Sequence, residues 1–579
     1  MSSLEILLEN KIISDFCYNF AKFVNKLNGK SSEIVQIIAA LTSASLNIHQ
    51  HIYLNLYNIN KYLETTEIDL PSTEDIVKEL LSSNVVGKYP ENKPLLYENG
   101  KVYINKYYQY ELGTAKLLIE CFNSEFQEDN NNEKFLDVLF GIEQNNMQRK
   151  TAEIALKNKF TILTGGPGTG KTTTVAKILL LLLYKNNDLS IGICAPTGKA
   201  AARLQTSLEE FLIKNAYLFE LEIFKNLKDK FPTKAYTIHT LLKSKFPSPT
   251  FHYNKNNPLN FDLIVVDETS MISLPLFYKL LSSIQKDTKI ILIGDKNQLS
   301  SVEPGNVFGD LCSFANSNNF IKSFYVELNK NYRFGEDSGI YKVSNIVNEK
   351  KVNELLEIIY ENKTADIKFY NIPENFENFI SFLDKKIEKY ITEYINFSPN
   401  TYDEYLEKFK LLENFIILTD SKDGTLGKNR INFIIENLLK KKLKIKDLSW
   451  YDGKPLIITK NDINTKLYNG DVGFVDKDYF ILKNGNEIRK IHKLRLPEYE
   501  TAFSLTVHKS QGSEYNNVMI ILGDENSKVL SKELLYTAIT RARKYVEIWA
   551  NRNTLIKCVS QEYKRESSLI EKLEKVLKL

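Results

Sequence analysis

The stretch FTILTGGPGTGKTTT, residues 160–174, decides the fold of this chain. An apolar strand leads into a glycine-rich loop with the spacing G-x-x-x-x-G-K-[ST], and a long apolar run follows. This context is typical of a phosphate-binding loop, because glycines let backbone N–H groups surround phosphate oxygens and the next helix presents its positive end. A glycine-rich turn that binds nothing is the alternative, and it leaves the flanking strand and helix unexplained. The residues expected to contact ATP here are Gly165, Gly166, Pro167, Gly168, Thr169, Gly170, Lys171, Thr172 and Thr173.

Two carboxylates end another apolar run, FDLIVVDE (261–268). Ligands of open α/β sheets bind at the carboxyl ends of the strands, so we expect Asp267 and Glu268 to face the phosphate loop. Lys171 is expected to reach the β- and γ-phosphates, and Asp267 and Thr172 to hold Mg²⁺. Glu268 is expected to position the attacking water. A solvated strand end is the alternative for an Asp-Glu pair without such a loop.

Gln298 and three arginines complete the candidate catalytic set. Gln298 follows the run TKIILIGD (288–295), and a glutamine there can touch both the γ-phosphate and a neighbouring domain. Polar turns after strands are common, so this signal is weak by itself. Phosphoryl transfer also needs positive charge in the transition state, for which Arg333, Arg541 and Arg543 are candidates. A surface salt bridge is the alternative for any one of them.

Continuous apolar runs alternate with helical stretches over most of the chain. The first set is 160–166, 189–197, 261–268, 288–295 and 323–328, and the second is 414–420, 516–522 and 545–550. Strands of a parallel sheet are buried on both faces and therefore appear as continuous apolar runs. The pattern predicts two α/β domains, each with a parallel sheet covered by helices.

The remaining segments have other textures. Residues 1–134 show apolar residues at helical spacing and predict a helical N-terminal domain that ends in a polar linker, 125–133. Residues 244–258 carry Pro and Asn and predict a short hairpin. Short strands with Asn-Gly turns at about 450–500 predict a small SH3-like β-barrel inserted into the second α/β domain. The expected domains are residues 1–134, 135–323 and 324–579.

Composition limits the class of protein. Hydrophobic residues make up 43% and charged residues 26%, which is typical of a folded domain, and the net charge of +4 is too small to indicate nucleic acid. The start of the chain is acidic and lacks the apolar core of a signal peptide, and no run reaches the roughly 20 apolar residues of a membrane span. We expect a cytoplasmic protein with no membrane contact and with reduced thiols, since the cysteines are odd in number and widely spaced: Cys17, Cys121, Cys194, Cys312 and Cys558.

Eight motifs in order resemble those of the RecD family of superfamily 1B helicases. They are NNMQRKTA (145–152), GGPGTGKTTT (165–174), CAPTGKAAARL (194–204), VVDETSMI (265–272), GDKNQLSSVEPGNV (294–307), LNKNYRF (328–334), LTVHKSQGSEY (505–515) and YTAITRAR (536–543). The resemblance implies two RecA-like motor domains, ATP and Mg²⁺ as cofactors, Gln148 as the residue that reads adenine, and 5′→3′ movement on single-stranded DNA. Thr269 is a departure from the family pattern, because residues 267–270 are DETS where DEAS is more usual.

The stretch IIAALTSASLNIHQHIYLNL (37–56) is similar to the RecD subunit of the RecBCD helicase–nuclease, exodeoxyribonuclease V. That resemblance implies a heterotrimer with RecB- and RecC-like subunits, action on duplex ends, and a role in double-strand break repair and recombination. A stand-alone RecD-like helicase and a mainly regulatory interaction subunit are the alternatives. A phosphate-loop ATPase or kinase unrelated to nucleic acid is a third, and the motifs beyond the phosphate loop oppose it. The sequence contains no carboxylate-rich nuclease cluster outside the ATP site.

Small, polar and basic residues at strand ends are candidates for DNA contact, because hydroxyls, amides and lysines bind phosphates without base preference. The expected residues are Thr197, Lys199, Thr237, His239, Thr506, His508 and Lys509. For His239 a core or capping role is equally consistent with the sequence.

Overall fold

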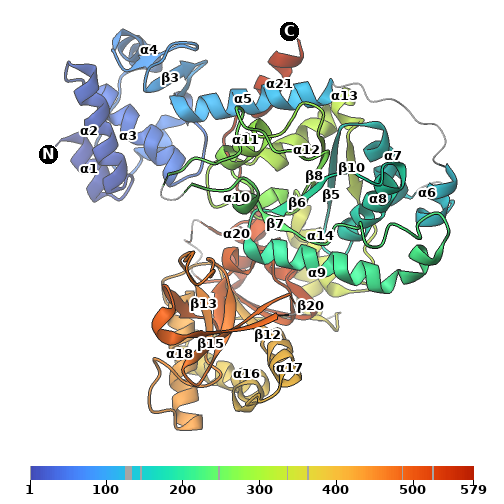
Figure 1. Ribbon diagram of the computed structural model, residues 1–579. Coiled ribbons are helices and arrows are strands. Elements are labelled where there is room, and N and C mark those ends of the chain that lie inside the picture. The colour runs from blue at the N-terminus through green and yellow to red at the C-terminus, as the bar shows by residue number, and fades with distance from the viewer. Residues whose placement is uncertain are drawn as a thin grey trace.

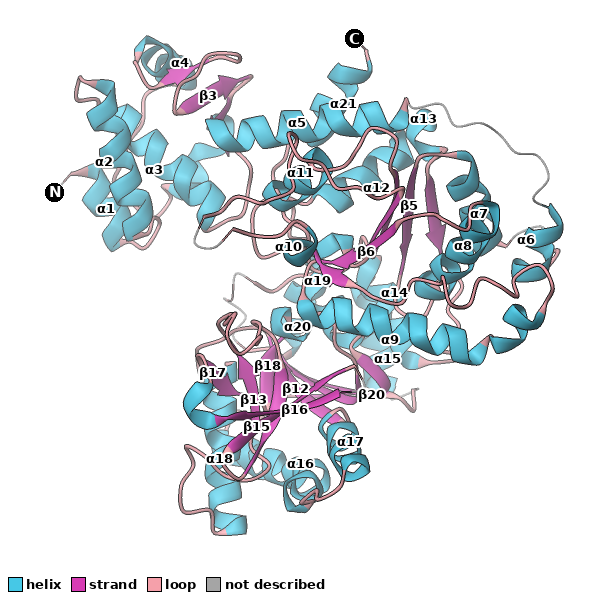
Figure 2. Cartoon of the chain, in the orientation of Figure 1, coloured by secondary structure: helices cyan, strands magenta, loops and turns pink. Residues whose placement is uncertain are grey.

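The computed structural model describes residues 2–123, 133–143, 146–245, 248–335, 337–361, 364–485, 487–523, 527 and 529–578. These residues form a helical N-terminal region, two α/β domains with parallel sheets and a small antiparallel sheet (Figure 1, Figure 2). The α/β fold with two parallel sheets is therefore confirmed. The predicted linker, 125–133, lies outside the described residues except for its last residue.

The first α/β domain contains a six-stranded sheet in the order β10-β5-β9-β8-β6-β7, with every pair parallel. The strands are β5 (Phe160–Gly165), β6 (Ile191–Ala195), β7 (Tyr236–Thr237), β8 (Leu263–Val266), β9 (Lys289–Gly294) and β10 (Tyr325–Leu328). Neighbouring residues of β5 enter opposite cores, Ile162 on one face and Leu163 on the other. Burial on both faces is the reason why these strands appear as continuous apolar runs.

Helices cover both faces of this sheet. One face packs against α5 (Asn105–Phe122), α11 (Leu274–Ser282) and α12 (Val307–Ser317), and the other against α7 (Met147–Lys157), α8 (Lys171–Lys185) and α9 (Gly198–Lys214). α8 is apolar almost all round and is buried from Val175 to Leu183, as a central helix should be. Because β10 pairs with β5, the first domain continues to Leu328, one strand beyond the boundary expected at residue 324.

The second α/β domain contains a five-stranded parallel sheet in the order β11-β20-β19-β12-β18. Its strands are β11 (Ile367–Tyr370), β12 (Phe415–Thr419), β18 (Ser504–Thr506), β19 (Tyr515–Ile521) and β20 (Ala542–Trp549). One core includes residues of α14 (Gly339–Asn348), α19 (Lys532–Ile539) and α20 (Arg552–Ser560), and the other includes residues of α16 (Phe376–Asn396), α17 (Tyr402–Leu412) and α18 (Lys428–Leu443). The apolar runs of the second set thus lie in one sheet, as predicted.

The predicted barrel region forms an antiparallel sheet in the order β16-β15-β14-β13-β17. Its strands are β13 (Pro455–Ile458), β14 (Val472–Asp476), β15 (Tyr479–Asn484), β16 (Glu487–His492) and β17 (Tyr499–Thr501). β16 and β17 are the outer strands of that order, so backbone pairing among the described residues does not close the sheet. Around 244–258, isolated antiparallel bridges join Ser244 to Phe251 and Asn254 to Asn257.

The N-terminal region is helical, as predicted, and also contains a four-stranded sheet in the order β1-β4-β3-β2. Its elements are α1 (Ser3–Glu9), α2 (Asp15–Asn28), α3 (Glu33–Asn47), β1 (Leu54–Asn55), α4 (Thr73–Ser82), β2 (Val86–Gly87), β3 (Leu95–Glu98) and β4 (Lys101–Ile104). α3 is buried almost throughout from Val35 to Leu46 and forms the centre of this core. Of the helices that the structure describes, none has the length and apolar character of a membrane span.

The C-terminal end returns to the first domain. α21 (Leu569–Leu577) lies along α5, and the two helices lie side by side near the C-terminus in Figure 1. Glu111 on α5 and Lys572 on α21 form an ion pair, and both side chains are buried. Glu111 also accepts a hydrogen bond from the backbone N–H of Ser568 at 2.8 Å. These bonds satisfy a buried carboxylate that would otherwise be costly.

Candidate active site

The phosphate loop between β5 and α8 depends on two glycines. Gly168 and Gly170 both have φ +81°, a left-handed backbone that glycine adopts without steric cost. A Cβ at Gly168 would lie 2.6 Å from the Cβ of Arg333. Nζ of Lys171 donates hydrogen bonds to the carbonyl oxygens of Gly165 at 2.6 Å and Gly166 at 3.0 Å. A bound triphosphate would take over this ammonium group from the loop carbonyls.

The other loop residues frame the same site. The carbonyl oxygen of Pro167 accepts a hydrogen bond from Nδ2 of Asn331 at 2.8 Å, and the Thr169 hydroxyl donates to the Gly166 carbonyl at 2.8 Å. Thr172 and Thr173 lie in the first turn of α8, where the backbone N–H groups have no partner within the helix. This is the geometry in which helix N-termini bind phosphate.

An amide and an aromatic ring lie beside the loop. Nε2 of Gln148 donates to the carbonyl oxygen of Thr169 at 3.4 Å, and the Tyr332 N–H donates to the Gly168 carbonyl at 2.8 Å. A Cβ at Gly170 would lie 2.5 Å from Nε2 of Gln148 and 3.7 Å from Cδ2 of Tyr332. The Tyr332 side chain is 59% exposed, so its ring can receive a planar ligand. Sequence reasoning missed Tyr332; its signal was an aromatic residue directly before a candidate arginine finger.

Asp267 and Glu268 follow β8 at the edge of the sheet where the phosphate loop lies. The Glu268 N–H donates to Oδ1 of Asp267 at 2.8 Å, and Glu268 has φ +50°, a strained left-handed backbone for a residue with a side chain. Burial, and after it the charge of Glu268, raises the pKa of Asp267 to about 6, against the opposing charges of Lys171 and Arg203. A cation beside Asp267 would therefore be stabilised.

Residues after β9 connect the two α/β domains. Nε2 of Gln298 donates to Oδ2 of Asp295 at 3.1 Å, and the Tyr536 hydroxyl of the second domain donates to the same carboxylate at 2.9 Å. The Leu299 N–H donates to the Thr537 hydroxyl at 2.9 Å. Oε1 of Gln298 is buried and has no hydrogen-bond partner among the residues described. This unsatisfied acceptor lies between the domains, where we expected the glutamine to act.

Glu514 is a carboxylate that sequence reasoning did not single out, and it gathers the arginines of the cleft. It pairs with Arg203 from α9, with Arg333 at 2.8 Å and with Arg543 at 3.2 Å. Burial alone would raise the pKa of Glu514, but the charges of Arg203, Arg333 and Arg541 outweigh it and lower the pKa to about 2. The structure thus brings arginines from both domains to one shared anion.

The two candidate arginine fingers differ in their surroundings. Arg541 is 2% exposed, and its guanidinium donates to the carbonyl oxygens of Thr537 at 3.1 Å and Ser513 at 3.3 Å. Burial lowers the pKa of Arg541, and the nearby charges of Glu268 and Glu514 oppose that effect. In Arg333 the Nη1 atom is buried without a hydrogen-bond partner among the described residues. A phosphate group would satisfy it.

Comparisons with known proteins bear on the family of this chain. Three family models match: the AAA domain over residues 148–304, the UvrD-like helicase C-terminal domain over 501–548, and the N-terminal domain of RecBCD enzyme subunit RecD over 9–103. RecBCD enzyme subunit RecD of Buchnera aphidicola (Acyrthosiphon pisum) is 32% identical over 95% of this chain and 97% of its own length. That of Haemophilus influenzae is 31% identical over 99% of each. The chain belongs to the RecD family.

The motif-based resemblance is therefore confirmed, and the chain is an ATP-dependent DNA helicase of the RecD type. The ATP-dependent RecD2 DNA helicase of Deinococcus radiodurans is a more distant relative, 25% identical over 72% of this chain and 50% of its own length. The match to the N-terminal domain of the RecBCD subunit RecD favours a RecD subunit over a stand-alone RecD-like helicase.

In this RecD-family chain, the candidate DNA contacts of the two domains approach each other. Thr197 caps α9 by accepting the Ala200 N–H, and a Cβ at Gly512 would lie 3.5 Å from the nitrogen of Ala200. Thr506 ends β18 and accepts the Lys509 N–H at 3.4 Å, and Nζ of Lys509 donates to Asn469 at 2.7 Å. The segments that carry Thr197 and Lys509 thus lie on facing sides of the domain junction.

Lys199 and His508 belong to the same junction. Burial raises the pKa of Asp471, which precedes β14, and the charge of Lys199 is one of the nearby contributions that oppose this shift. His508 is half-buried, and burial followed by the charge of Arg565 lowers its pKa. Both side chains lie where strands of the two parallel sheets end.

Thr237 lies at the same edge of the first sheet, because it pairs with Ala195 at the end of β6. Its hydroxyl caps the short helix α10 (Ile238–Leu241) by accepting the Thr240 N–H. His239 follows in that helix; it is exposed, and its ring lies 5.6 Å from that of Phe251. The exposure opposes a core role for His239.

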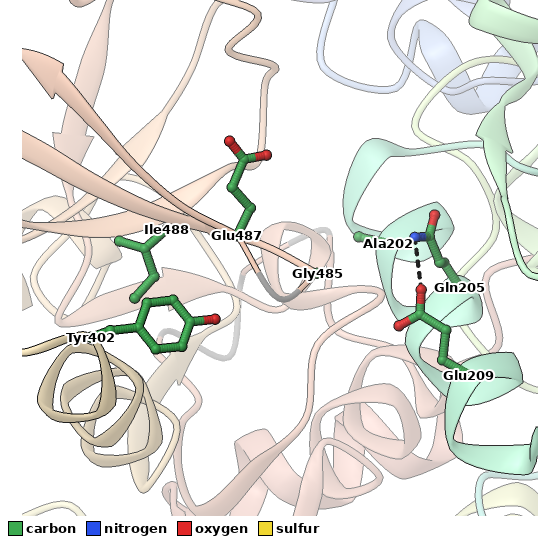
Figure 3. Close-up of a pocket in the computed structure, with 7 residues that line it drawn as sticks. All are labelled: Ala202, Gln205, Glu209, Tyr402, Gly485, Glu487 and Ile488. Carbon is green, nitrogen blue, oxygen red and sulfur yellow. Dashed lines mark hydrogen bonds between the residues drawn. The ribbon is translucent and has the colours of Figure 1, made fainter. Parts of the chain in front are cut away.

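A further hollow of about 690 Å³ lies between α9 and the β15–β16 hairpin. Figure 3 shows Gln205 and Glu209 of α9 facing Tyr402, Glu487 and Ile488 across it. Nε2 of Gln205 donates to Glu209 at 3.0 Å. The described residues that line this hollow include two carboxylates and no lysine or arginine, so its charge does not suit a nucleic-acid backbone.

Proposed function

We propose that this chain uses ATP hydrolysis to move 5′→3′ along single-stranded DNA as part of a RecBCD-type enzyme in the cytoplasm. The observation that carries the proposal is the position of the ATP site between two parallel-sheet domains. The phosphate loop and Asp267 come from the first domain, whereas Arg541 and Tyr536 come from the second. A ligand in that cleft would hold the domains together, and its hydrolysis would release them.

The described residues also suit Mg²⁺. Mg²⁺ binds oxygen ligands, and Asp267 and Thr172 offer a carboxylate and a hydroxyl beside the phosphate loop. Burial and the neighbouring charge of Glu268 raise the pKa of Asp267, and a bound cation would favour the charged form of this carboxyl group. When bound, the ion would neutralise phosphate charge during transfer. MgATP is therefore the proposed cofactor.

Each side chain has a proposed role in the cycle. Gln148 and Tyr332 hold the base, and Lys171 exchanges its loop carbonyls for phosphate oxygens. Glu268 orients the attacking water, which becomes bonded to the γ-phosphorus as the bond to the ADP oxygen breaks. Arg333 and Arg541 stabilise the charge that develops. Gln298 links the γ-phosphate to the second domain, and DNA phosphates are held by Thr197, Lys199, Thr237, His239, Thr506 and His508.

The direct test uses the full chain with tailed duplexes of both polarities. We expect single-stranded DNA to stimulate ATP hydrolysis and unwinding to require a 5′ tail. An ATPase that ignores DNA, or unwinding that requires a 3′ tail, would contradict the proposal. Unwinding only when RecB- and RecC-like subunits are added would identify a partner-dependent motor and not a stand-alone helicase.

The proposed partner surface is an apolar stripe on α2. Phe16 is 63% exposed, Phe23 58% and Leu27 49%, and Phe20 lies between them at helical spacing. The adjacent face of α2, including Cys17, packs into the N-terminal core. Exposed apolar stripes of this kind mark protein interfaces. We assign it to a RecB- or RecC-like subunit, in keeping with the RecD match over 9–103.

Co-purification of the Phe16→Ser, Phe23→Ser variant with RecB- and RecC-like subunits tests this surface. Ile213→Ser is the matched control, because Ile213 is 76% exposed on α9 in the motor. We expect assembly to be lost in the double variant only, while both variants keep DNA-stimulated ATPase. Normal assembly of the double variant would show that the stripe is not the interface. Loss of DNA binding with normal assembly would favour a DNA-guiding role for the stripe.

A further inference from the structure

A C-terminal strap, residues 561–568, runs from α20 of the second domain to α21 on the first. On the way it binds the N-terminal region. The Tyr563 hydroxyl donates to the carbonyl oxygen of His49 at 2.8 Å, and the Glu566 N–H donates to Nδ1 of His51 at 3.1 Å. The Ile52 N–H donates to the Glu566 carbonyl at 2.8 Å. The strap therefore contacts all three parts of the molecule.

Arg565 projects from this strap into the loop that follows Gln298. Its Nη1 donates to the Ser301 hydroxyl at 3.2 Å, the Glu303 carbonyl at 2.8 Å and the Gly305 carbonyl at 2.7 Å. Its Nη2 donates to the Ser301 carbonyl and to Oε1 of Gln50. Burial lowers the pKa of Arg565 to about 10, so the guanidinium remains charged at neutral pH. One side chain thus joins five acceptors from two regions.

The same loop, residues 298–305, is held at its other end by the second domain. Leu299 donates its N–H to Thr537, and its carbonyl oxygen accepts from Nε2 of Gln511 at 2.8 Å. Thr537 and Gln511 lie in the two motifs that carry Arg541 and Glu514. A movement of the second domain on nucleotide binding would therefore pull on one end of this loop, and Arg565 holds the other.

The backbone conformations of Gln50 and Gly305 show how closely the N-terminal region and the 298–305 loop are packed. Gln50 has φ +58°, which a residue with a side chain rarely adopts, and its carbonyl oxygen accepts the Gly305 N–H at 3.3 Å. Gly305 has φ +96°, and a Cβ there would lie 2.8 Å from Leu274 and 3.4 Å from Ile52. The loop lies too close to α11 for a side chain at residue 305, and Ile52 of the N-terminal region packs against the same point.

We propose that Arg565 is a positioning residue that anchors the 298–305 loop to the N-terminal region and so couples ATP hydrolysis to movement on DNA. With the 301–305 end of the loop fixed by Arg565, closure of the second domain moves that domain relative to the N-terminal region and the first domain. Without this anchor the whole loop moves with the second domain, and the relative movement that advances the protein on DNA is lost. This inference rests on the proposed ATP-driven movement along DNA.

The test compares Arg565→Gln with Lys564→Gln in the full chain. Lys564 is the exposed neighbour on the same strap and loses the same charge. We expect Arg565→Gln to lower the nucleotides advanced per ATP by roughly three- to tenfold, the scale of a network that couples two sites, while DNA-stimulated ATP turnover stays near normal. Lys564→Gln should change neither. Arg565→Lys should recover part of the ratio, because it keeps the charge but not the fork of donors.

Gln50→Gly separates positioning from stability. Glycine accepts φ +58° without strain, so this variant removes one acceptor of Arg565 without weakening the fold. We expect an unchanged or higher melting temperature together with a lower ratio of nucleotides to ATP. A normal ratio in both Gln50→Gly and Arg565→Gln would overturn the inference, as would a ratio that falls only with the melting temperature. Absence of DNA-driven movement in the wild-type chain, both alone and with RecB- and RecC-like subunits, would instead refute the proposed function.

Discussion

At the residue scale, the charged side chains of the site have partners within the protein. The Lys171 ammonium group is bound to carbonyl oxygens of its own loop, and Glu514 neutralises arginines that come from both domains. Both arrangements leave positive groups facing the place where a triphosphate would bind. Electrostatic preorganisation of this kind lowers the reorganisation needed at the moment of reaction.

Lys171→Gln should abolish ATP hydrolysis and leave the fold intact, because among the described residues its amine bonds to the backbone carbonyls of Gly165 and Gly166 and to no core side chain. Loss of a group that stabilises transition-state charge costs about 100-fold or more in turnover. Steady-state ATPase with single-stranded DNA, together with thermal unfolding, measures both effects. Lys185→Gln, at the far end of α8, is the control and should hydrolyse ATP normally. Near-normal turnover in Lys171→Gln would refute the site.

Glu514→Gln should destabilise the domain junction, because three arginines lose their shared anion. The pKa of Glu514 is lowered from 4.5 to about 2, so its carboxylate stabilises the fold above pH 4.5 and this contribution disappears as the pH falls towards 2. At neutral pH the difference from wild type should be about 2–4 kcal/mol. Urea unfolding at several pH values should show the two proteins converging between pH 4.5 and 2; a constant difference would contradict the charge argument.

At the scale of elements, the segment after β10 crosses the phosphate loop and joins the domains. Asn331, Tyr332 and Arg333 all contact this loop or the groups around it. The crossing is possible because the loop has no side chain at Gly168, where the two backbones approach closely. The positions of the Tyr332 ring and of Arg333 therefore depend on a glycine in another element.

Gly168→Ala should weaken ATP binding strongly. The new Cβ would meet Cβ of Arg333 at 2.6 Å and push the crossing segment away. Gly29→Ala is the matched control, since Gly29 has φ +75° but no atom within 4 Å of the added Cβ. Both should lose about 1 kcal/mol of stability through the left-handed backbone. Titration with a fluorescent ATP analogue should distinguish them; equal affinities would show that the clash is relieved without cost.

At the scale of the whole molecule, the N-terminal region, the first domain and the end of the chain form one connected body. The strap binds His49, His51 and Ile52, and the buried pair of Glu111 and Lys572 fixes α21 on α5. The second domain is attached to this body through the 298–305 loop, the strap and the segment after β10, and through the contacts of Glu514 with Arg203 and of Tyr536 with Asp295. A partner bound to the N-terminal region would thus be mechanically connected to the ATP site.

The strap should loosen at mildly acidic pH. Burial, then the charges of Lys61, His49 and Arg565, lowers the pKa of His51 from 6.5 to about 4, and its neutral Nδ1 accepts the Glu566 N–H. The neutral ring therefore stabilises the fold above pH 6.5, and this contribution is lost as the pH falls towards 4. We expect about 1–3 kcal/mol less stability over that window. His51→Gln should have a flatter profile; an identical pH dependence would exclude His51 as the cause.

Much of the site was predictable because its signals are local. Each signal lies within a short stretch of sequence. Examples are the strand, loop and helix around Lys171, the carboxylates after β8 and each of the motifs. Tyr332 could have been found by the same reasoning, since it directly precedes Arg333 in the same motif. Glu514 could not, because its role arises from arginines at positions 203, 333 and 543 that only the fold brings together.

By itself, the sequence determined the two parallel sheets, the phosphate loop and the family, because continuous burial and glycine spacing leave direct traces in residue order. Only the tertiary structure decided that Glu514 gathers the arginines, that Arg565 reaches the loop after Gln298, and that α21 lies on α5. These contacts join residues far apart in the chain. Their stability comes from burial and charge pairing that exist only once the domains have packed, so no local pattern records them.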